Sequence, residues 1–212
     1  MKYGTEKILD NLIERYPLLG HAKESIIGAF DIIYRAFCEG NKLLLCGNGG
    51  SAADCEHIVG ELMKGFKKNR PIKTEVAGKL RSFGEMGGLL SEKLEGALPA
   101  VALTGHFSLS TAVANDMGQD LVFAQQLYGL AQKGDVLFAV STSGNSRNCV
   151  YAALTAKATG LKVIALTGAS DSKLSELSDI CIRVPSTETF KVQEFHLPVY
   201  HCLCAMLEEE AF

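Results

Sequence analysis

The chain has 212 residues, of which 47% are apolar and 21% charged, and its formal net charge is −3 at pH 7. This is the composition of a globular domain with a large core. It gives no reason to expect a nucleic-acid or membrane partner, because it has neither a strongly basic field nor an apolar run of about 20 residues. The seven cysteines form no CxxC pair, and the N-terminal stretch lacks the apolar centre of a signal peptide. We therefore expect a cytoplasmic protein with reduced thiols.

Two helical stretches begin the chain. Residues 4–17 and 21–39 have helical hydrophobic periodicity and are separated by a proline and a glycine, which predicts a helical hairpin. Their apolar faces need a cover, either the rest of this chain or another subunit. We expect residues 1–40 to belong to the same unit as the domain formed by residues 41–212.

Five short apolar runs follow, and segments with helical periodicity separate them. The runs are continuous rather than alternating, which is typical of strands buried on both faces of a parallel sheet. They are KLLLC (42–46), AVALT (100–104), VLFAVST (136–142), KVIALTG (162–168) and ICIRVP (180–185). Strands that alternate with helices predict an α/β fold with a doubly wound, five-stranded parallel sheet.

The segment 66–99 interrupts this alternation. It contains a proline, several glycines and the amphipathic piece LLSEKLEG, so we expect a long excursion with one short helix. Connections of this length are usually functional or make oligomer contacts.

Two glycine-rich turns each connect a predicted strand to a predicted helix. The first, CGNGGSA, begins at Cys46, and its glycines permit close approach of a ligand to free N–H groups at a helix start. A tight turn without a ligand explains the same glycines. The second, VSTSGNS, adds four hydroxyls from Ser141, Thr142, Ser143 and Ser146, which can surround a phosphate. Ser146 alone is also explained as a helix N-cap.

The second turn lacks the lysine of a nucleotide-hydrolysing P-loop, so a sugar phosphate or another small organic phosphate fits it better. A third group of polar residues, Asn115 and Asp116 in VANDMG, is expected at the same sheet edge, where it can orient hydroxyl groups. Asn-Asp is also an ordinary turn pair.

Four side chains in two helical stretches have the spacing of a metal site. His57 and Glu61 are four residues apart and share one helix face. The C-terminal stretch offers four further candidates, Gln193, Glu194, His196 and His201. Gln193 and His201, eight residues apart, lie within about 80° of each other on a helix, whereas His196 falls off that face. Each histidine taken alone is also consistent with an ordinary core or surface residue.

The motifs CGNGGSAAD, HxxxE, AxxND, STSGNS, LTG, RVPS and QExH-x4-H occur in this order. In this the chain resembles the phosphoheptose isomerases of the sugar-isomerase (SIS) domain superfamily over about residues 35–208. The resemblance implies a flavodoxin-like five-stranded parallel sheet and a homotetramer with sites at subunit interfaces. It also implies conversion of sedoheptulose 7-phosphate to D-glycero-D-manno-heptose 7-phosphate.

The resemblance further implies roles for individual residues. Substrate contacts are expected from both turns, from the Asn-Asp pair and from two helical side chains: Asn48, Gly49, Gly50, Ser51, Asn115, Asp116, Ser141, Thr142, Ser143, Ser146, Glu61 and Gln193. Four side chains match Zn²⁺ ligands: His57, Glu61, Gln193 and His201. Glu61 and His201 match the acid–base pair.

These groups suit the reaction, because moving a carbonyl between C2 and C1 passes through an enediolate. Glu61 is the expected base and His201 the expected acid, while a metal polarises the carbonyl. A carboxylate bound to zinc is a poorer base, so either the metal releases Glu61 during turnover or the two roles are partly separate.

Two features leave the substrate open. The excursion 66–99 is longer than in the familiar short isomerases, and Phe190 and Lys191 replace the more usual small or acidic residue and arginine. Two alternatives also remain: a non-catalytic relative that binds a replication initiator, and a regulatory sugar-phosphate sensor. The first lacks the acid–base side chains at the positions of Glu61 and His201.

Overall fold

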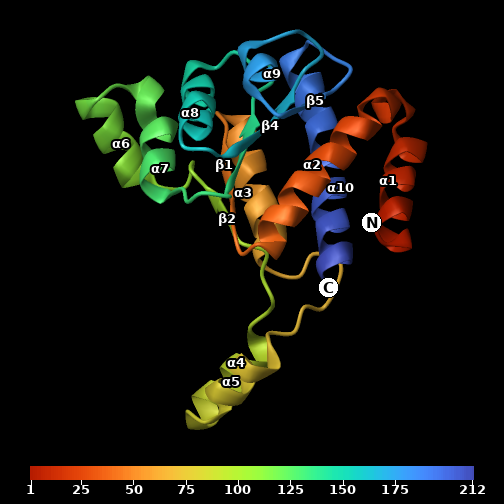
Figure 1. Ribbon diagram of the computed structural model, residues 1–212, viewed down its shortest axis with the longest axis vertical. Coiled ribbons are helices and arrows are strands. Elements are labelled where there is room, and N and C mark those ends of the chain that lie inside the picture. Colours follow the sequence, from red (N-terminus) through yellow and green to blue (C-terminus); the bar gives the residue numbers. More distant parts are fainter.

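A five-stranded sheet forms the centre of the computed structural model, which describes residues 1–212 (Figure 1). The strands are β1 (Leu43–Cys46), β2 (Ala100–Ala102), β3 (Val136–Val140), β4 (Lys162–Thr167) and β5 (Ile180–Arg183). Their order is β2-β1-β3-β4-β5, and all neighbouring pairs are parallel. The predicted α/β fold with a doubly wound sheet is confirmed.

The chain begins with α1 (Tyr3–Arg15), the short 3-10 helix η1 (Pro17–Ala22) and α2 (Lys23–Cys38). This is the helical hairpin that the sequence predicts. The other helices are α3 (Gly50–Met63), α4 (Thr74–Arg81), α5 (Gly84–Lys93), α6 (Phe107–Asp116), η2 (Gln119–Leu121), α7 (Val122–Leu130), α8 (Arg147–Ala158), α9 (Lys173–Leu177) and α10 (Thr189–Ala211). None of the helices combines the length and the apolar character that crossing a bilayer requires.

Alternating side chains of each strand give the sheet two apolar faces. Leu43 and Leu45 of β1 pack into the larger core cluster with α1, α2, α3 and α10. Leu44 and Cys46 pack into the smaller cluster on the opposite face, together with α7, α8 and α9. The continuous apolar runs in the sequence reflect this burial on both faces. All seven cysteines are free thiols, as the sequence suggests.

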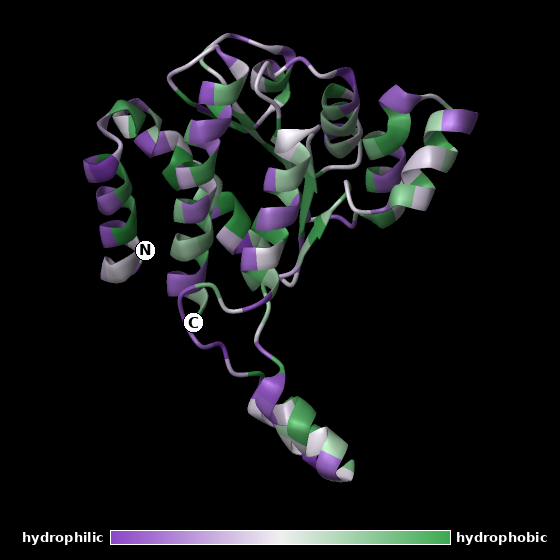
Figure 2. Ribbon diagram, turned by 180° about the vertical axis from the view of Figure 1, so that it is seen from behind, coloured by the Kyte–Doolittle hydropathy of each residue, from purple (hydrophilic) through white to green (hydrophobic).

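The segment 66–99, which lies between α3 and β2, differs from the prediction of one short helix. It forms two, α4 and α5, which pack on each other and project away from the sheet (Figures 1 and 2). The two ends of this α4–α5 hairpin (residues 72–94) lie together, because Pro71 and Glu95 form an isolated antiparallel bridge. The hairpin is therefore an excursion on a narrow stem, and none of its residues belongs to the two apolar cores that cover the sheet.

A buried ion pair anchors the stem to the domain. Arg70 Nε donates to Glu208 Oε1 at 2.7 Å, and Arg70 Nη1 donates to the backbone oxygen of Leu62 at 2.7 Å. Glu208 also accepts bonds from the backbone N–H groups of Phe66 and Lys67. Burial by itself would raise the pKa of Glu208, but these bonds and the Arg70 charge outweigh it, and the pKa is lowered.

His196 lies fully buried on the core side of α10, and neither ring nitrogen has a hydrogen-bond partner. Burial lowers its pKa from 6.5 to about 4, because the charged imidazolium loses its hydration. The side chain is therefore a neutral core group, and the structure places it apart from the metal-ligand face of α10.

We expect His196 to make the protein less stable in acid. The unfolded chain takes up a proton below pH 6.5, whereas the folded chain resists it until about pH 4, so stability is lost as the pH falls through this window. Urea unfolding from pH 8 to pH 4 should show that His196→Leu removes about 3 kcal/mol of this loss. His21→Leu serves as a control at an exposed histidine, and parallel profiles for wild type and His196→Leu would contradict the assignment.

Candidate functional site

The two glycine-rich turns lie where the strand order reverses. In the sheet, β1 lies between β2, the next strand along the chain, and β3. The loops after β1 and β3 therefore flank a crevice at the carboxyl edge of the sheet. Gly49 has φ +55° and Gly144 has φ +63°, a backbone conformation that side chains rarely adopt. Both glycines are thus required by the shape of the turns.

The hydroxyls of the second turn are only partly used within the protein. Ser141 Oγ and Ser146 Oγ lie 3.1 Å apart, and Ser143 Oγ accepts a bond from the backbone N–H of Asn145. Ser146 occupies the N-cap position of α8, but its side chain makes no capping bond. Within the first turn of α8, the Cys149 N–H donates to Asn148 Oδ1, whereas the N–H groups of Arg147 and Asn148 have no side-chain acceptor and can bind an anion. This favours the phosphate interpretation of Ser146 over the simple cap.

A reciprocal amide pair joins the two turns. Asn48 Nδ2 donates to Asn148 Oδ1 at 2.9 Å, and Asn148 Nδ2 donates to Asn48 Oδ1 at 2.8 Å. The pair borders a cavity of about 570 Å³ whose wall also includes Ser146 and Arg147. Arg147 is held by Asp120 at 3.1 Å. Sequence reasoning did not identify Asn148 or Arg147, although both directly follow the serine-rich turn.

Asn115 and Asp116 occupy a different environment from the one expected. They form the last two residues of α6 rather than a turn that directly follows a strand, and Asn115 Nδ2 donates to Asp116 Oδ1 at 2.8 Å. Neither residue lines the cavity beside Asn48. Their predicted contact with substrate stays a prediction.

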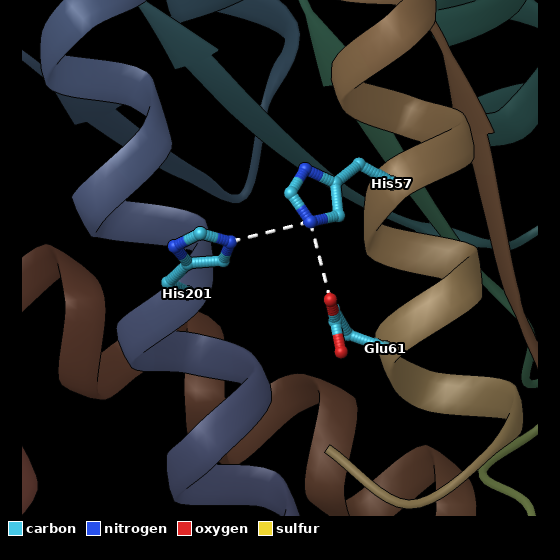
Figure 3. A group of neighbouring side chains, drawn as sticks. All are labelled: His57, Glu61 and His201. Carbon is cyan, nitrogen blue, oxygen red and sulfur yellow. Dashed lines mark hydrogen bonds and ion pairs between the residues drawn. The ribbon is translucent and has the colours of Figure 1, made fainter. Parts of the chain in front are cut away.

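Three of the four expected metal ligands meet between α3 and α10 (Figure 3). His57 Nε2 lies 3.1 Å from Glu61 Oε1 and 3.4 Å from His201 Nε2. Glu61 is mostly buried, with 14% of its side chain exposed, while the side chain of His57 is 43% exposed. The two imidazoles thus meet across the helix interface and are not separate surface groups.

Two further side chains, Tyr200 and Asp54, lie next to this cluster. The Tyr200 hydroxyl lies 3.1 Å from His57 Nδ1 and 3.2 Å from Asp54 Oδ1. Burial raises the pKa of both Tyr200 and Asp54, and burial together with the nearby His57 lowers the pKa of His201. Sequence reasoning did not identify Tyr200 or Asp54, although Asp54 shares the α3 face of His57 and Glu61 at helical spacing.

Gln193 lies nearer to the first turn than to the histidines. A Cβ atom on Gly50 would come within 2.5 Å of Gln193 Nε2, so the carboxamide packs directly on this glycine. His201 is eight residues further along α10, a rise of about 12 Å. Ser51 is buried at the start of α3, and its backbone N–H donates to Asn48.

The donor set suits a divalent metal of the zinc type. Two imidazole nitrogens and a carboxylate oxygen converge within 4.8 Å of one another, and these are preferred zinc ligands. A cavity of about 700 Å³ between α1 and α10 includes His201 in its wall, together with the cationic side chains Lys7, Arg15 and Lys67. The cluster is therefore accessible to a polar ligand.

Comparison with known proteins identifies relatives over most of the chain. The SIS domain family model matches residues 12–96 and 80–168. The chain is 39% identical to the phosphoheptose isomerase of Rhodospirillum rubrum over 90% of this chain and 88% of that protein. It is 40% identical to that of Akkermansia muciniphila, over 82% of this chain and 78% of the relative. The solved phosphoheptose isomerase of Neisseria gonorrhoeae superimposes with a TM-score of 0.72 at 31% identity, covering 96% and 98% of the two chains.

We expect Gly144→Ala to damage the second turn. An alanine would be strained at φ +63° and its Cβ would clash with the Ser172 side chain. The variant should lose about 1–2 kcal/mol of unfolding free energy from backbone strain alone, and inorganic phosphate should no longer raise its melting temperature. Gly160→Ala is a matched control, because φ there is +79° but no atom lies within 4 Å of the added Cβ. Equal phosphate-induced shifts in the two variants would argue against a phosphate site in this turn.

Proposed function

The chain belongs to the SIS domain family and, within it, to the phosphoheptose isomerases, which makes it a phosphosugar isomerase, and we propose that it converts sedoheptulose 7-phosphate to D-glycero-D-manno-heptose 7-phosphate. The observation that carries the proposal is the meeting of Glu61 with two histidines beside a glycine-rich sheet edge. A base and an acid next to a phosphate cradle are what an aldose–ketose isomerisation needs.

The phosphate of the substrate is assigned to the second turn. Ser141, Thr142, Ser143 and Ser146 supply hydroxyl donors, and the start of α8 supplies N–H groups. The first turn and Gln193 contact the sugar chain next to it. From Gln193 the α10 helix runs about 12 Å to His201. An extended seven-carbon phosphate has a comparable length, so its carbonyl end can reach the acid–base pair.

The reaction moves one proton between neighbouring carbons. Glu61 removes the proton beside the carbonyl, and the enediolate is reprotonated on the adjacent carbon, with His201 moving the hydroxyl protons. His201 is suited to this step, because its lowered pKa leaves the imidazole neutral at pH 7. Low exposure of Glu61 limits its hydration and keeps the carboxylate available as a base.

Zinc is the metal we assign to the cluster, held by His57, Glu61 and His201. Gln193, the fourth expected ligand, packs on Gly50 about 12 Å along α10 from His201, so its carboxamide would have to turn towards the cluster to bind the metal. When bound, it supplies a positive charge that polarises the carbonyl and stabilises the enediolate oxygen. The structure offers a way to divide the roles of Glu61. One oxygen, Oε1, faces His57, while Oε2 lies 3.5 Å from Lys64 Nζ. One oxygen can act as ligand while the other accepts the proton.

We further propose that the protein forms a homotetramer with sites at subunit interfaces, and that the α4–α5 hairpin packs against the hairpin of a second copy. Phe83 is 75% exposed and Met86 78% exposed, and Leu89 is also exposed. Helices of eight and ten residues are too short to be stable alone in water, so this apolar surface needs a cover.

Charge favours an identical hairpin as that cover. The helix α4 has two basic side chains and one acidic side chain, which makes it net positive, whereas α5 has two acidic side chains and one basic side chain, which makes it net negative. These residues are Lys79, Arg81 and Glu75 on α4, and Glu85, Glu92 and Lys93 on α5. In a two-fold pair, α4 of one copy can face α5 of the other, which brings opposite charges together around the apolar side chains.

We expect Glu61→Gln to lose at least 100-fold in turnover of sedoheptulose 7-phosphate, because the amide cannot accept the proton. The measurement is a discontinuous product assay on the zinc-loaded protein, together with its zinc content and melting temperature. Glu24→Gln, an exposed change on α2, is the control. Full activity of Glu61→Gln would refute the base assignment. Absence of turnover by the wild type with any C5 to C7 ketose phosphate that raises its melting temperature would favour the regulatory alternative.

We expect removal of residues 72–94 to reduce the assembly while the domain stays folded. A short Gly-Ser link can join Pro71 to Glu95, because these residues already pair. Sedimentation equilibrium should give fewer subunits per assembly for the deletion and for Met86→Glu, but not for Leu154→Glu, an exposed apolar residue on α8. Combining Lys79→Glu with Glu92→Lys should restore part of the association that Lys79→Glu alone loses. An unchanged number of subunits in the deletion variant would exclude the hairpin as an interface.

A further inference from the structure

We propose that Tyr200, together with Asp54, is a positioning residue that fixes the tautomer and ring orientation of His57. This inference rests on the proposed function, since it assigns these two side chains to the support of the metal and acid–base cluster. Neither residue is one of the expected ligands, and neither forms a hydrogen bond with Glu61. Their effect on the reaction would pass through the imidazole of His57.

The hydroxyl of Tyr200 has two partners and one proton. Its oxygen lies 3.2 Å from Asp54 Oδ1 and 3.1 Å from His57 Nδ1. An ionised carboxylate accepts hydrogen bonds and has none to donate. The tyrosine therefore donates to Asp54, and its oxygen accepts the remaining bond from His57 Nδ1–H. The order along the chain of bonds is carboxylate, hydroxyl, imidazole.

This order determines what the other ring nitrogen of His57 can do. With the proton on Nδ1, Nε2 carries a lone pair, and it points at Glu61 Oε1 3.1 Å away and at His201 Nε2 3.4 Å away. An imidazole lone pair and a carboxylate oxygen repel each other unless a proton or a metal ion lies between them. This chain of hydrogen bonds from Asp54 through Tyr200 to His57, here called the relay, leaves His57 Nε2 and Glu61 Oε1 facing each other without a shared proton, a repulsion that a bound cation would relieve (Figure 3).

Burial of Tyr200 holds the hydrogen bonds of the relay in one geometry. Tyr200 is 1% exposed and belongs to the core cluster shared by α3 and α10. Its ring also lies edge-on to the rings of both His57 and His201, with centroids 5.5 Å and 5.0 Å away. The second carboxylate oxygen of Asp54 is buried without a partner, so this side chain has no other hydrogen-bonding role within the domain.

Tyr200→Phe tests the inference, because it removes the hydroxyl and keeps the ring. Loss of a side chain that hydrogen-bonds to a metal ligand typically changes metal affinity by about 10- to 100-fold. We expect a loss of that size in zinc affinity, measured by competition with a chromophoric chelator, without loss of the folded state by circular dichroism. Tyr34→Phe is the matched control, since its hydroxyl contacts the backbone of Glu210 and lies on α2. Asp54→Asn retains an acceptor oxygen and should lose less affinity than Asp54→Ala.

A second readout does not depend on zinc. Nitrogen-15 spectra of the metal-free wild type should show His57 protonated on Nδ1, and Tyr200→Phe should shift the population towards the Nε2–H form. Zinc affinity of Tyr200→Phe within twofold of wild type, or an unchanged tautomer, would overturn the positioning role. If the wild type bound no zinc but showed the Nδ1–H tautomer, the metal assignment would fail while the relay would stand.

Discussion

The site of this protein depends on the packing of one long helix, α10, against α3. The contact is largely apolar, with Cys55, Ile58 and Leu62 of α3 in the same core cluster as Val199 and Leu203 of α10. On the exposed side of this contact, the same helix pair brings an imidazole from each helix to within hydrogen-bonding distance. Burial of apolar surface therefore provides the free energy that holds the polar groups in position, and the polar groups themselves need contribute little.

The sheet topology supplies the second half of the site. Because β1 is flanked by β2 and β3, the loops that leave β1 and β3 are neighbours at one edge, and each leads into a helix start. The Asn48–Asn148 pair joins these loops, so the two turns form one continuous surface, to which we assign the phosphate. The helix α3 begins at this surface and carries His57 and Glu61 further along, so one helix links the proposed phosphate site to the proposed acid–base pair.

The α4–α5 hairpin shows how an insertion can be added without disturbing this arrangement. Its ends meet at the Pro71–Glu95 bridge, and the buried Arg70–Glu208 pair fixes the stem to the end of α10. Removing either partner of a buried ion pair strongly destabilises a protein, because the other charge is left buried and unpaired. This ion pair therefore fixes the position of the stem but not that of the hairpin beyond it. The hairpin therefore adds to the outer surface of the protein and is not part of the contact between α3 and α10.

The sequence by itself determined the strands, the helical hairpin and the two glycine turns, because periodicity and turn chemistry are local properties of the chain. It also placed His57 and Glu61 on one helix face. Only the tertiary structure decided that His201 meets them, that Asn115 ends a helix, and that the excursion holds two helices. The first of these outcomes depends on how helices far apart in sequence pack together, and the tyrosine beside His201 acquires its partners only through that packing.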